Sequence, residues 1–348
     1  MALQWVDRHR PTSLNELSFH SDLSQRLGTL ASDGDFPHLL VYGPSGSGKK
    51  TRINCVIKEL FGEGVEKIKV EERLFQTPSN KKLPFYTVSS IYHLEMTPSE
   101  VGFSDRVVIQ DLLKEIAQTP QLDSNAKHQF KVVVINEADA LSHDAQAALR
   151  RTMEKYMANL RVILCCNSSS KIISPIRSRC LLVRVGAPSV AEVMKVLHIF
   201  SNKENFVLSS AVAEKIAEES DGNLRKAILM LESLKFTSGN DYPRADTIVK
   251  LDWEVYISDI AKAIIANQSE TNLESIRKMF YQLIFSCIEP SLIIKTLAFE
   301  LVKYIEHEDV KCQIILEAAD CEHRLHLGQK KIFYLEAFAI KTMHIYKW

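Results

Sequence analysis

Short apolar runs alternate with helical patterns in the first half of the chain. Four runs, at 39–42, 132–135, 162–166 and 181–185, have the length and composition of buried strands. The segments between them place apolar residues at the three- and four-residue spacing of amphipathic helices. Strands that alternate with helices are typical of an α/β fold, in which helices cover a parallel sheet. For the polar stretch after the first helix, we predict one strand near 67–70 and then irregular chain.

The pattern changes after residue 186, where no further strand is predicted. Ser189 suits the N-cap of a helix over 190–200. Two more helices are expected at 211–219 and 224–234, and the turn-forming residues at 238–243 read as a linker.

From about residue 252 the pattern is almost entirely helical. Apolar residues recur at helical spacing in two clear stripes, Ile276, Met279, Phe280 and Leu283, and Ile332, Leu335, Phe338 and Ala339. The chain therefore divides into an α/β region over 1–186, a small helical region over 187–243 and a helical region over 244–348.

The charge balance, the cysteines and the absence of long apolar runs limit which kinds of partner and binding site we expect. The 348 residues include 43 basic and 43 acidic side chains, so contact with nucleic acid has to come from local patches. The seven cysteines show no C-x-x-C pair or zinc-ligand spacing, which favours free thiols. We find no signal peptide and no long apolar span, and we expect no membrane partner.

The strongest chemical signal is a glycine-rich loop between the first strand and the next helix. Residues 43–51 read Gly-Pro-Ser-Gly-Ser-Gly-Lys-Lys-Thr and match the phosphate-loop pattern G-x-x-x-x-G-K. Glycines let backbone N–H groups surround an anion, and the helix N-terminus adds its dipole. The predicted nucleotide-binding residues are Gly43, Pro44, Ser45, Gly46, Ser47, Gly48, Lys49, Lys50 and Thr51.

Two substitutions remove the side chains that hold a metal ion in such loops. Lys50 occupies the place of the usual Ser or Thr, and Asn136 that of the Asp at the end of the second strand, whereas Glu137 is retained. Thr51 is rotated by about 100° on the helix and cannot replace the missing hydroxyl. The two changes make the pocket about two charge units more positive than in the usual loop of this type. We expect ATP or ADP to bind with weak or absent Mg²⁺ and without efficient hydrolysis.

Several segments in the same order resemble one known family. They are Trp-Val-Asp-Arg-His-Arg-Pro at 5–11, the loop itself, Asn-Glu-Ala-Asp at 136–139, Ala-Leu-Arg-Arg-Thr-Met-Glu at 148–154, Ser-Arg-Cys at 178–180 and Gly-Asn-Leu-Arg at 222–225. The chain thus resembles the replication factor C small subunits, clamp loaders of the AAA+ class. The paired lysines and altered acidic box look like one particular subunit type. His9 replaces the family's usual aromatic residue.

The resemblance implies an architecture and a set of partners. The three regions would be an AAA+ nucleotide-binding domain, a helical lid and a helical collar that supports oligomerisation. The partners would be the other subunits of a hetero-pentamer, a PCNA-type sliding clamp and primer–template DNA. The work would be clamp loading for replication and repair, in the nucleus.

Arg179, in the Ser-Arg-Cys segment, would act as an arginine finger on a neighbouring subunit's ATP. Ser174 and Pro175 predict an N-cap and first turn for a short helix over 176–179, followed at once by a strand. The alternative is an arginine in a surface ion pair. Arg177 is the less favoured candidate.

The resemblance also implies nucleotide-related roles for four other residues, and each of them has a simpler structural alternative. Asn167, at a strand end, resembles a sensor of the γ-phosphate but can equally form a turn. Arg225, in the first turn of a lid helix, resembles a second sensor or is a solvated charge. Val6 and Leu17 would flank the adenine or simply pack in the core.

DNA contact is expected at the helix over 107–117. Arg106 at its start could bind phosphate together with the backbone N–H groups, and Lys114 lies on its exposed side. Each is otherwise a solvated charge.

Two other functional hypotheses remain. One is an autonomous AAA+ ATPase of the helicase-loader type, and the other is a scaffold subunit with an empty pocket.

Overall fold

The computed structural model describes residues 4–33, 36–76, 82–118, 130–157, 159–238 and 251–347. It divides into two compact units, Met1–Ile248 and Val249–Trp348, and each is described by itself. Of the linker predicted at 238–243, residue 238 ends a helix and residues 239–243 lie outside the described residues.

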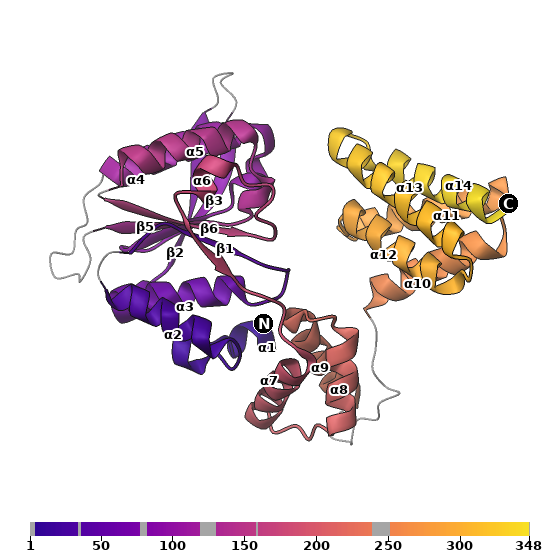
Figure 1. Cartoon of the computed structure of the whole chain (residues 1–348), viewed down its shortest axis with the longest axis horizontal. Coiled ribbons are helices and arrows are strands. Elements are labelled where there is room, and N and C mark those ends of the chain that lie inside the picture. Colours follow the sequence, from indigo (N-terminus) through magenta and orange to yellow (C-terminus); the bar gives the residue numbers. More distant parts are fainter. Residues whose placement is uncertain are drawn as a thin grey trace. The chain divides into compact units, whose positions relative to one another are not determined.

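The first unit is built on a seven-stranded sheet in the order β2-β3-β4-β5-β6-β1-β7 (Figure 1). The strands are β1 (Leu39–Tyr42), β2 (Lys69–Gln76), β3 (Lys82–Ser89), β4 (His93–Met96), β5 (Lys131–Ile135), β6 (Leu160–Cys166) and β7 (Leu181–Arg184). The pairs from β4 to β7 are parallel, whereas β3 runs antiparallel to both its neighbours. The α/β prediction is confirmed, but the sheet is mixed.

The prediction of irregular chain after 67–70 was wrong. That stretch forms β2, β3 and β4, and β2 pairs with β3 along eight residues. Pro84 is tolerated because β4 pairs only with Thr87–Ser89, so the part of β3 that contains the proline has one hydrogen-bonded neighbour. Long-range pairing therefore fixes a segment whose local composition gives a weak strand signal.

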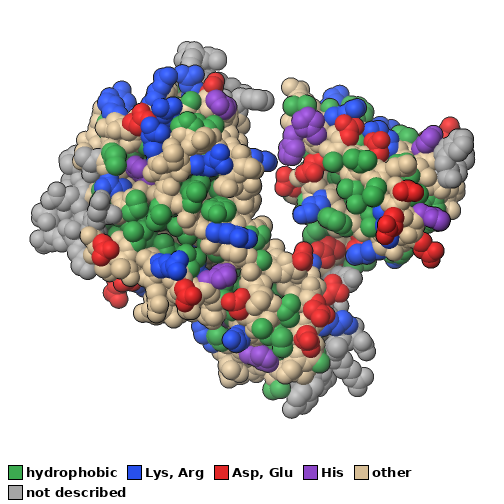
Figure 2. Space-filling view, viewed as in Figure 1, with side chains coloured by type: hydrophobic (Ala, Val, Ile, Leu, Met, Phe, Trp, Pro, Cys, Tyr) green, Lys and Arg blue, Asp and Glu red, His purple; other side chains and the backbone are tan. Residues whose placement is uncertain are grey.

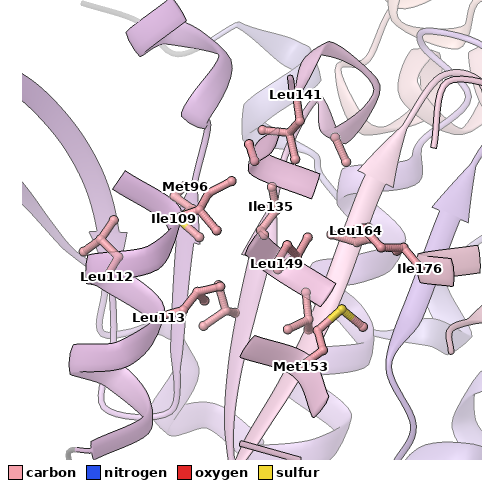
Figure 3. Packing of buried hydrophobic residues seen from close by; sticks show 14 of the residues in the cluster. Met96, Ile109, Leu112, Leu113, Ile135, Leu141, Leu149, Met153, Leu164 and Ile176 are labelled. Carbon is pink, nitrogen blue, oxygen red and sulfur yellow. The ribbon is translucent and has the colours of Figure 1, made fainter. Parts of the chain in front are cut away.

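Helices cover both faces of this sheet (Figure 1). Helices α2 (Ser21–Ser32) and α3 (Lys49–Phe61) pack on one face, and α4 (Asp105–Gln118) and α5 (His143–Lys155) on the other. Figure 3 shows the second of these cores, in which Ile109 and Leu113 of α4 and Leu149 and Met153 of α5 lie against Ile135 of the sheet. The two cores hold the strand ends, and thus the loops that follow them, in fixed positions.

After the last strand, three helices of the first unit pack together: α7 (Val190–Lys203), α8 (Ser210–Glu219) and α9 (Leu224–Ser238). Ser189 begins α7 as predicted, in a capping box with Glu192. The N-terminal helix α1 (Trp5–Arg8) joins their core through buried Trp5.

The second unit consists of five helices within the described residues: α10 (Asp252–Ala266), α11 (Glu270–Phe285), α12 (Pro290–Tyr304), α13 (Glu308–Leu327) and α14 (Lys331–Lys347). Both predicted apolar stripes belong to its core, on α11 and α14. Among the described residues, no helix is long and apolar enough to cross a membrane.

Charges of both signs are interspersed over the face drawn in Figure 2. This distribution agrees with the formal net charge of zero. Any electrostatic attraction for a partner therefore has to be local.

Candidate nucleotide-binding site

The phosphate loop connects β1 to α3 with little room for side chains. Gly46 has a φ of 76°, in the left-handed region that favours glycine. An added Cβ at Gly43 would lie 1.8 Å from the backbone oxygen of Val185, and one at Gly46 would lie 1.8 Å from Oδ1 of Asn223. The loop is thus closely packed against the chain that leads into the helical region.

Helix α3 begins directly after this loop, and no N-cap side chain bonds its first backbone N–H groups, which can therefore donate to an anion. Gly48 is its N-cap and provides no side chain to bond the first N–H groups. At thirteen residues the helix is long enough to carry a substantial dipole toward its N-terminus. Backbone donors and dipole together make this a phosphate-binding end.

Lys49 is buried within the loop. Its Nζ donates to the carbonyl oxygens of Gly43 at 2.7 Å and Pro44 at 2.8 Å, and to Oδ1 of Asn167 at 3.0 Å. Burial lowers the pKa of the Lys49 ammonium. The predicted sensor Asn167 therefore contacts the phosphate-loop lysine directly.

The two substituted positions meet at a third residue, Glu95, which the sequence did not indicate. Lys50 forms an ion pair with Oε1 of Glu95. The side-chain amide of Asn136 donates to the same oxygen at 2.7 Å. Glu95 lies in β4, which pairs in parallel with β5, and it reaches the strand end where Asn136 follows. Its charge is paired with that of Lys50, a contact that the sequence-based count of two extra positive units did not include.

The retained acidic residues have partners of their own. Glu137 has a φ of 50° and accepts from the Ser99 hydroxyl at 2.8 Å. Oδ2 of Asp139 accepts from the backbone N–H of Asn167 at 3.1 Å. Neither carboxylate makes a hydrogen bond or ion pair with Lys50 in the structure.

Lys49, Lys50, Asn136, Glu137, Asp139 and Asn167 line one cavity of about 390 Å³, whereas Glu95 and Ser99 lie behind its lining residues. That volume is within the usual range of ligand sites. The predicted nucleotide contacts that line the cavity are Val6, Leu17, Ser45, Gly46, Gly48, Lys49, Lys50, Thr51, Asn167 and Arg225. The predicted contacts Gly43, Pro44 and Ser47 do not line it. Val6 and Leu17 also pack against the neighbouring cores, as the plainer alternative expected, and their contact with adenine stays a prediction.

The donor set does not fit Mg²⁺. Mg²⁺ takes oxygen ligands in near-octahedral geometry, whereas an ammonium has no acceptor atom. Lys50 stands at one ligand position, and at the other the Asn136 amide group is turned so that its nitrogen donates to Glu95. Among the described residues, no group of three or more His, Cys, Asp or Glu side chains could hold a metal ion.

Arg179 lies away from this cavity. The short helix α6 (Ser174–Arg177) ends before it, two residues earlier than the predicted helix over 176–179, and Ile173 rather than Ser174 is its N-cap. The Arg179 guanidinium pairs with Oε1 of Glu154 at 2.5 Å and donates to the Pro175 carbonyl at 2.8 Å. Its side chain is 35% exposed.

Glu154 is shared between two arginines. Arg150 also bonds it, at 3.1 Å, and this hydrogen bond together with the charge of Arg179 lowers the pKa of the Glu154 carboxyl. The surface ion pair considered as the alternative for Arg179 is therefore present in the structure. An exposed pair of this kind is weak, so it leaves the arginine free to exchange partners.

Arg106 and Lys114 lie on α4 and are exposed, outside the cavity. The expected role of the helix N-terminus is only partly supported by the structure. The backbone N–H of Arg106 donates to Oδ1 of buried Asp105 at 2.7 Å, so this group is already bonded. DNA contact by the two side chains stays a prediction.

Comparison with known proteins decides the family. The chain is 53% identical to "Replication factor C subunit 5" of Neurospora crassa over 98% of this chain and 97% of that protein. It is 49% identical to "Replication factor C subunit 3" of Homo sapiens over 99% and 96%. The chain belongs to the replication factor C subunit family.

Family models support the assignment region by region. Within this replication factor C chain, residues 253–348 match the C-terminal domain of replication factor C subunit 3, and 195–236 match the RCF1/5-like AAA+ ATPase lid domain. Residues 19–189 match the model of the DNA polymerase III delta subunit. Membership in the AAA+ class implies nucleotide binding.

Solved structures show the same fold. The RuvB Holliday junction branch migration motor of Thermotoga maritima is 18% identical, with a TM-score of 0.52 over 75% of this chain and 80% of that one. At this identity the likeness supports the AAA+ fold of the replication factor C chain and nothing finer.

Sequence reasoning missed Glu95, Ser99 and Glu154. The alternation of His93-Leu94-Glu95-Met96 is a strand signal that could have predicted β4 with Glu95 and His93 on one face. Nothing local marks Glu154 as the partner of an arginine 25 residues later, because only the fold brings them together.

Proposed function

We propose that this chain is a clamp-loader subunit that binds ATP or ADP in its own pocket without efficient hydrolysis. The observation that carries the proposal is the contrast within one cavity. The phosphate loop keeps Lys49, which is hydrogen-bonded to the loop backbone. The two positions that usually ligate the metal hold Lys50 and Asn136 instead. Without a metal ion, the leaving and transferred phosphoryl charges lose their main stabilising partner.

The subunit works in a complex with other replication factor C subunits. The printed names of its relatives, subunits 5 and 3, support this part. Loading a PCNA-type sliding clamp onto primer–template DNA for replication and repair, in the nucleus, follows from the same resemblance. Arg106 and Lys114 are proposed to contact the DNA backbone, where binding weakens steeply with salt.

Arg179 is proposed to serve the ATP of a neighbouring subunit. It follows α6 directly, is partly exposed, and is held only by an exposed carboxylate and one carbonyl. A guanidinium can leave such a pair for the stronger charge of a γ-phosphate. An arginine supplied in trans raises the rate by a factor of about 10³–10⁵.

The test is ATP hydrolysis by the reconstituted complex in the presence of clamp and DNA. Arg179→Ala should lower the rate of the neighbour's site by about 10³-fold or more while assembly stays intact. Arg177→Ala, two residues away at the end of α6, is the matched control and should retain the rate. A normal rate with Arg179→Ala, or a loss confined to Arg177→Ala, would overturn the finger role.

The competing functions give different results with the purified chain. An autonomous ATPase would turn over ATP briskly in magnesium buffer. A scaffold with an empty pocket would neither retain nucleotide through purification nor bind added ADP. The proposal expects bound nucleotide and negligible turnover.

A further inference from the structure

Three side chains from three separate elements meet where a nucleotide-bound metal would be ligated. Lys50 comes from the first turn of α3, Glu95 from β4 and Asn136 from the end of β5. A single carboxylate oxygen, Oε1 of Glu95, accepts from both the ammonium and the amide. Glu95 is 12% exposed and Lys50 46% exposed, so the anchor is largely buried and the lysine is reachable from the cavity.

We propose that the Lys50 ammonium, anchored by Glu95 and Asn136, takes the place of the divalent cation, so that this chain binds nucleotide phosphates equally well with and without Mg²⁺. This inference rests on the proposed nucleotide binding and specifies its chemistry. Glu95 is a positioning residue, since it acts through Lys50.

The hydrogen-bonding capacity of the group supports this role. An ammonium has three donors, and the ion pair with Glu95 uses one of them. Two remain for phosphate oxygens, which are strong acceptors. The Asn136 amide holds the other side of the carboxylate oxygen, which restricts where Glu95 can place the lysine.

The charges point the same way. The usual metal-free site, with one Asp and one hydroxyl residue, carries one negative charge, which repels phosphate. Here Lys50 and Glu95 cancel and Asn136 is neutral, so the trio carries no net charge before nucleotide arrives. The trio itself therefore adds no repulsion toward phosphate, and the carboxylates of Glu137 and Asp139 are bonded elsewhere, to Ser99 and to the Asn167 backbone.

A metal ion would have to displace this arrangement in order to bind. The carboxylate oxygen nearest the two substituted positions is already bonded twice. Mg²⁺ gives up its water ligands reluctantly and needs oxygen ligands that an ammonium cannot supply. Glu137 and Asp139 accept from Ser99 and from the Asn167 backbone, respectively.

The test measures the affinity of the full-length chain for fluorescently labelled ADP and ATP in EDTA and in magnesium buffer. The inference predicts the same Kd in both, within about twofold. Binding that is at least tenfold tighter with Mg²⁺ would overturn it and leave the proposed function standing. Absence of binding in both buffers would instead overturn the proposed nucleotide binding itself and the inference with it.

Substitutions then locate the effect. Lys50→Thr should weaken binding in EDTA by roughly tenfold or more, because a charge-assisted bond to phosphate is lost. Lys50→Thr combined with Asn136→Asp should regain affinity only when Mg²⁺ is added. Lys58→Thr removes a lysine from the same helix that pairs with Glu66 outside the cavity, and should change neither value. A double variant that stays indifferent to Mg²⁺ while folded would contradict the assignment.

Discussion

The two sides of the cavity differ in whether they keep the residues of a phosphate-loop nucleotide site. On the phosphate side, the loop, Lys49 and the start of α3 keep the residues and the geometry that hold an anion. On the metal side, an ammonium and an amide stand where oxygen ligands belong, and both are tied to Glu95. One side fits nucleotide and the other does not fit Mg²⁺.

The difference shows that binding and hydrolysis rest on separable parts of one site. Phosphate recognition uses backbone N–H groups, a helix dipole and a lysine, none of which needs a metal. Phosphoryl transfer needs a cation that neutralises the charge developing between the β- and γ-oxygens. Under the proposed function, a subunit without the metal-binding part would still bind nucleotide and could act on a neighbour's site.

The largest effect is expected from adding a methyl group at Gly43, where the phosphate loop packs against Val185. In Gly43→Ala the new methyl group would meet the rigid backbone oxygen of Val185. We expect a loss of about 3 kcal/mol in the free energy of unfolding, measured by urea denaturation, because the backbone has to move. Gly28→Ala is the control: its methyl group would meet only Leu14 at 3.8 Å, so stability should hold or rise slightly. Equal stability of the two variants would refute the packing argument.

The next effect removes the phosphate-side lysine. Lys49→Ala should weaken binding of labelled ADP by about a hundredfold, since a buried charge-assisted interaction with phosphate is lost. Lys58→Ala, on the same helix but outside the cavity, serves as the control. Retained affinity in Lys49→Ala would show that the loop does not hold the phosphates as described.

Much of the phosphate side could be predicted from the sequence because its signal is local. A strand, a glycine loop and a helix follow one another within 39–61, and the structure keeps all three. The metal side depended on tertiary contacts. Asn136 and Lys50 could be recognised as substitutions in the sequence. Glu95 could not be linked to them, because only the parallel pairing of β4 with β5 brings it beside Asn136.

A buried histidine just before β1 makes the free energy of unfolding depend on pH. His38, just before β1, is buried, and its Nδ1 accepts from the backbone N–H of Val162 at 3.0 Å. Burial, and secondarily the charge of Arg161, lowers the pKa of His38 from 6.5 to about 4. The unfolded chain therefore binds more protons between these values, and stability falls as pH drops through this window.

At pH 5 the cost is about 2 kcal/mol relative to pH 7. Urea denaturation at the two pH values measures it. His38→Asn, whose amide oxygen can accept from the same N–H group, should lose this part of the pH dependence. An unchanged pH profile in that variant would contradict the buried neutral histidine.

The smallest effect concerns the thiols. Cys287 and Cys312 are exposed and the other five cysteines are buried. Burial raises the pKa of Cys165 to about 11 and of Cys166 to about 12; both lie at the end of β6 and line the cavity. Titration of the native chain with a thiol reagent near pH 8 should therefore show two fast-reacting groups. Fast labelling of Cys165 or Cys166 would mean that the strand under the cavity opens readily.

Contacts between distant segments account for the remaining surprises. The ion pair of Arg179 with Glu154 joins partly exposed side chains 25 residues apart, and no periodicity of the sequence fixes this pairing. The helical second unit was easier, because its apolar stripes repeat at a spacing that only a helix can bury on one side.

The most direct test is a high-resolution structure of the chain, alone or in its complex, with nucleotide and excess Mg²⁺. We predict phosphates along residues 43–50, the Lys50 ammonium on a phosphate oxygen and still paired with Glu95, and no octahedral ion beside them. An ion with oxygen ligands at about 2.1 Å, and Lys50 displaced from Glu95, would contradict the account.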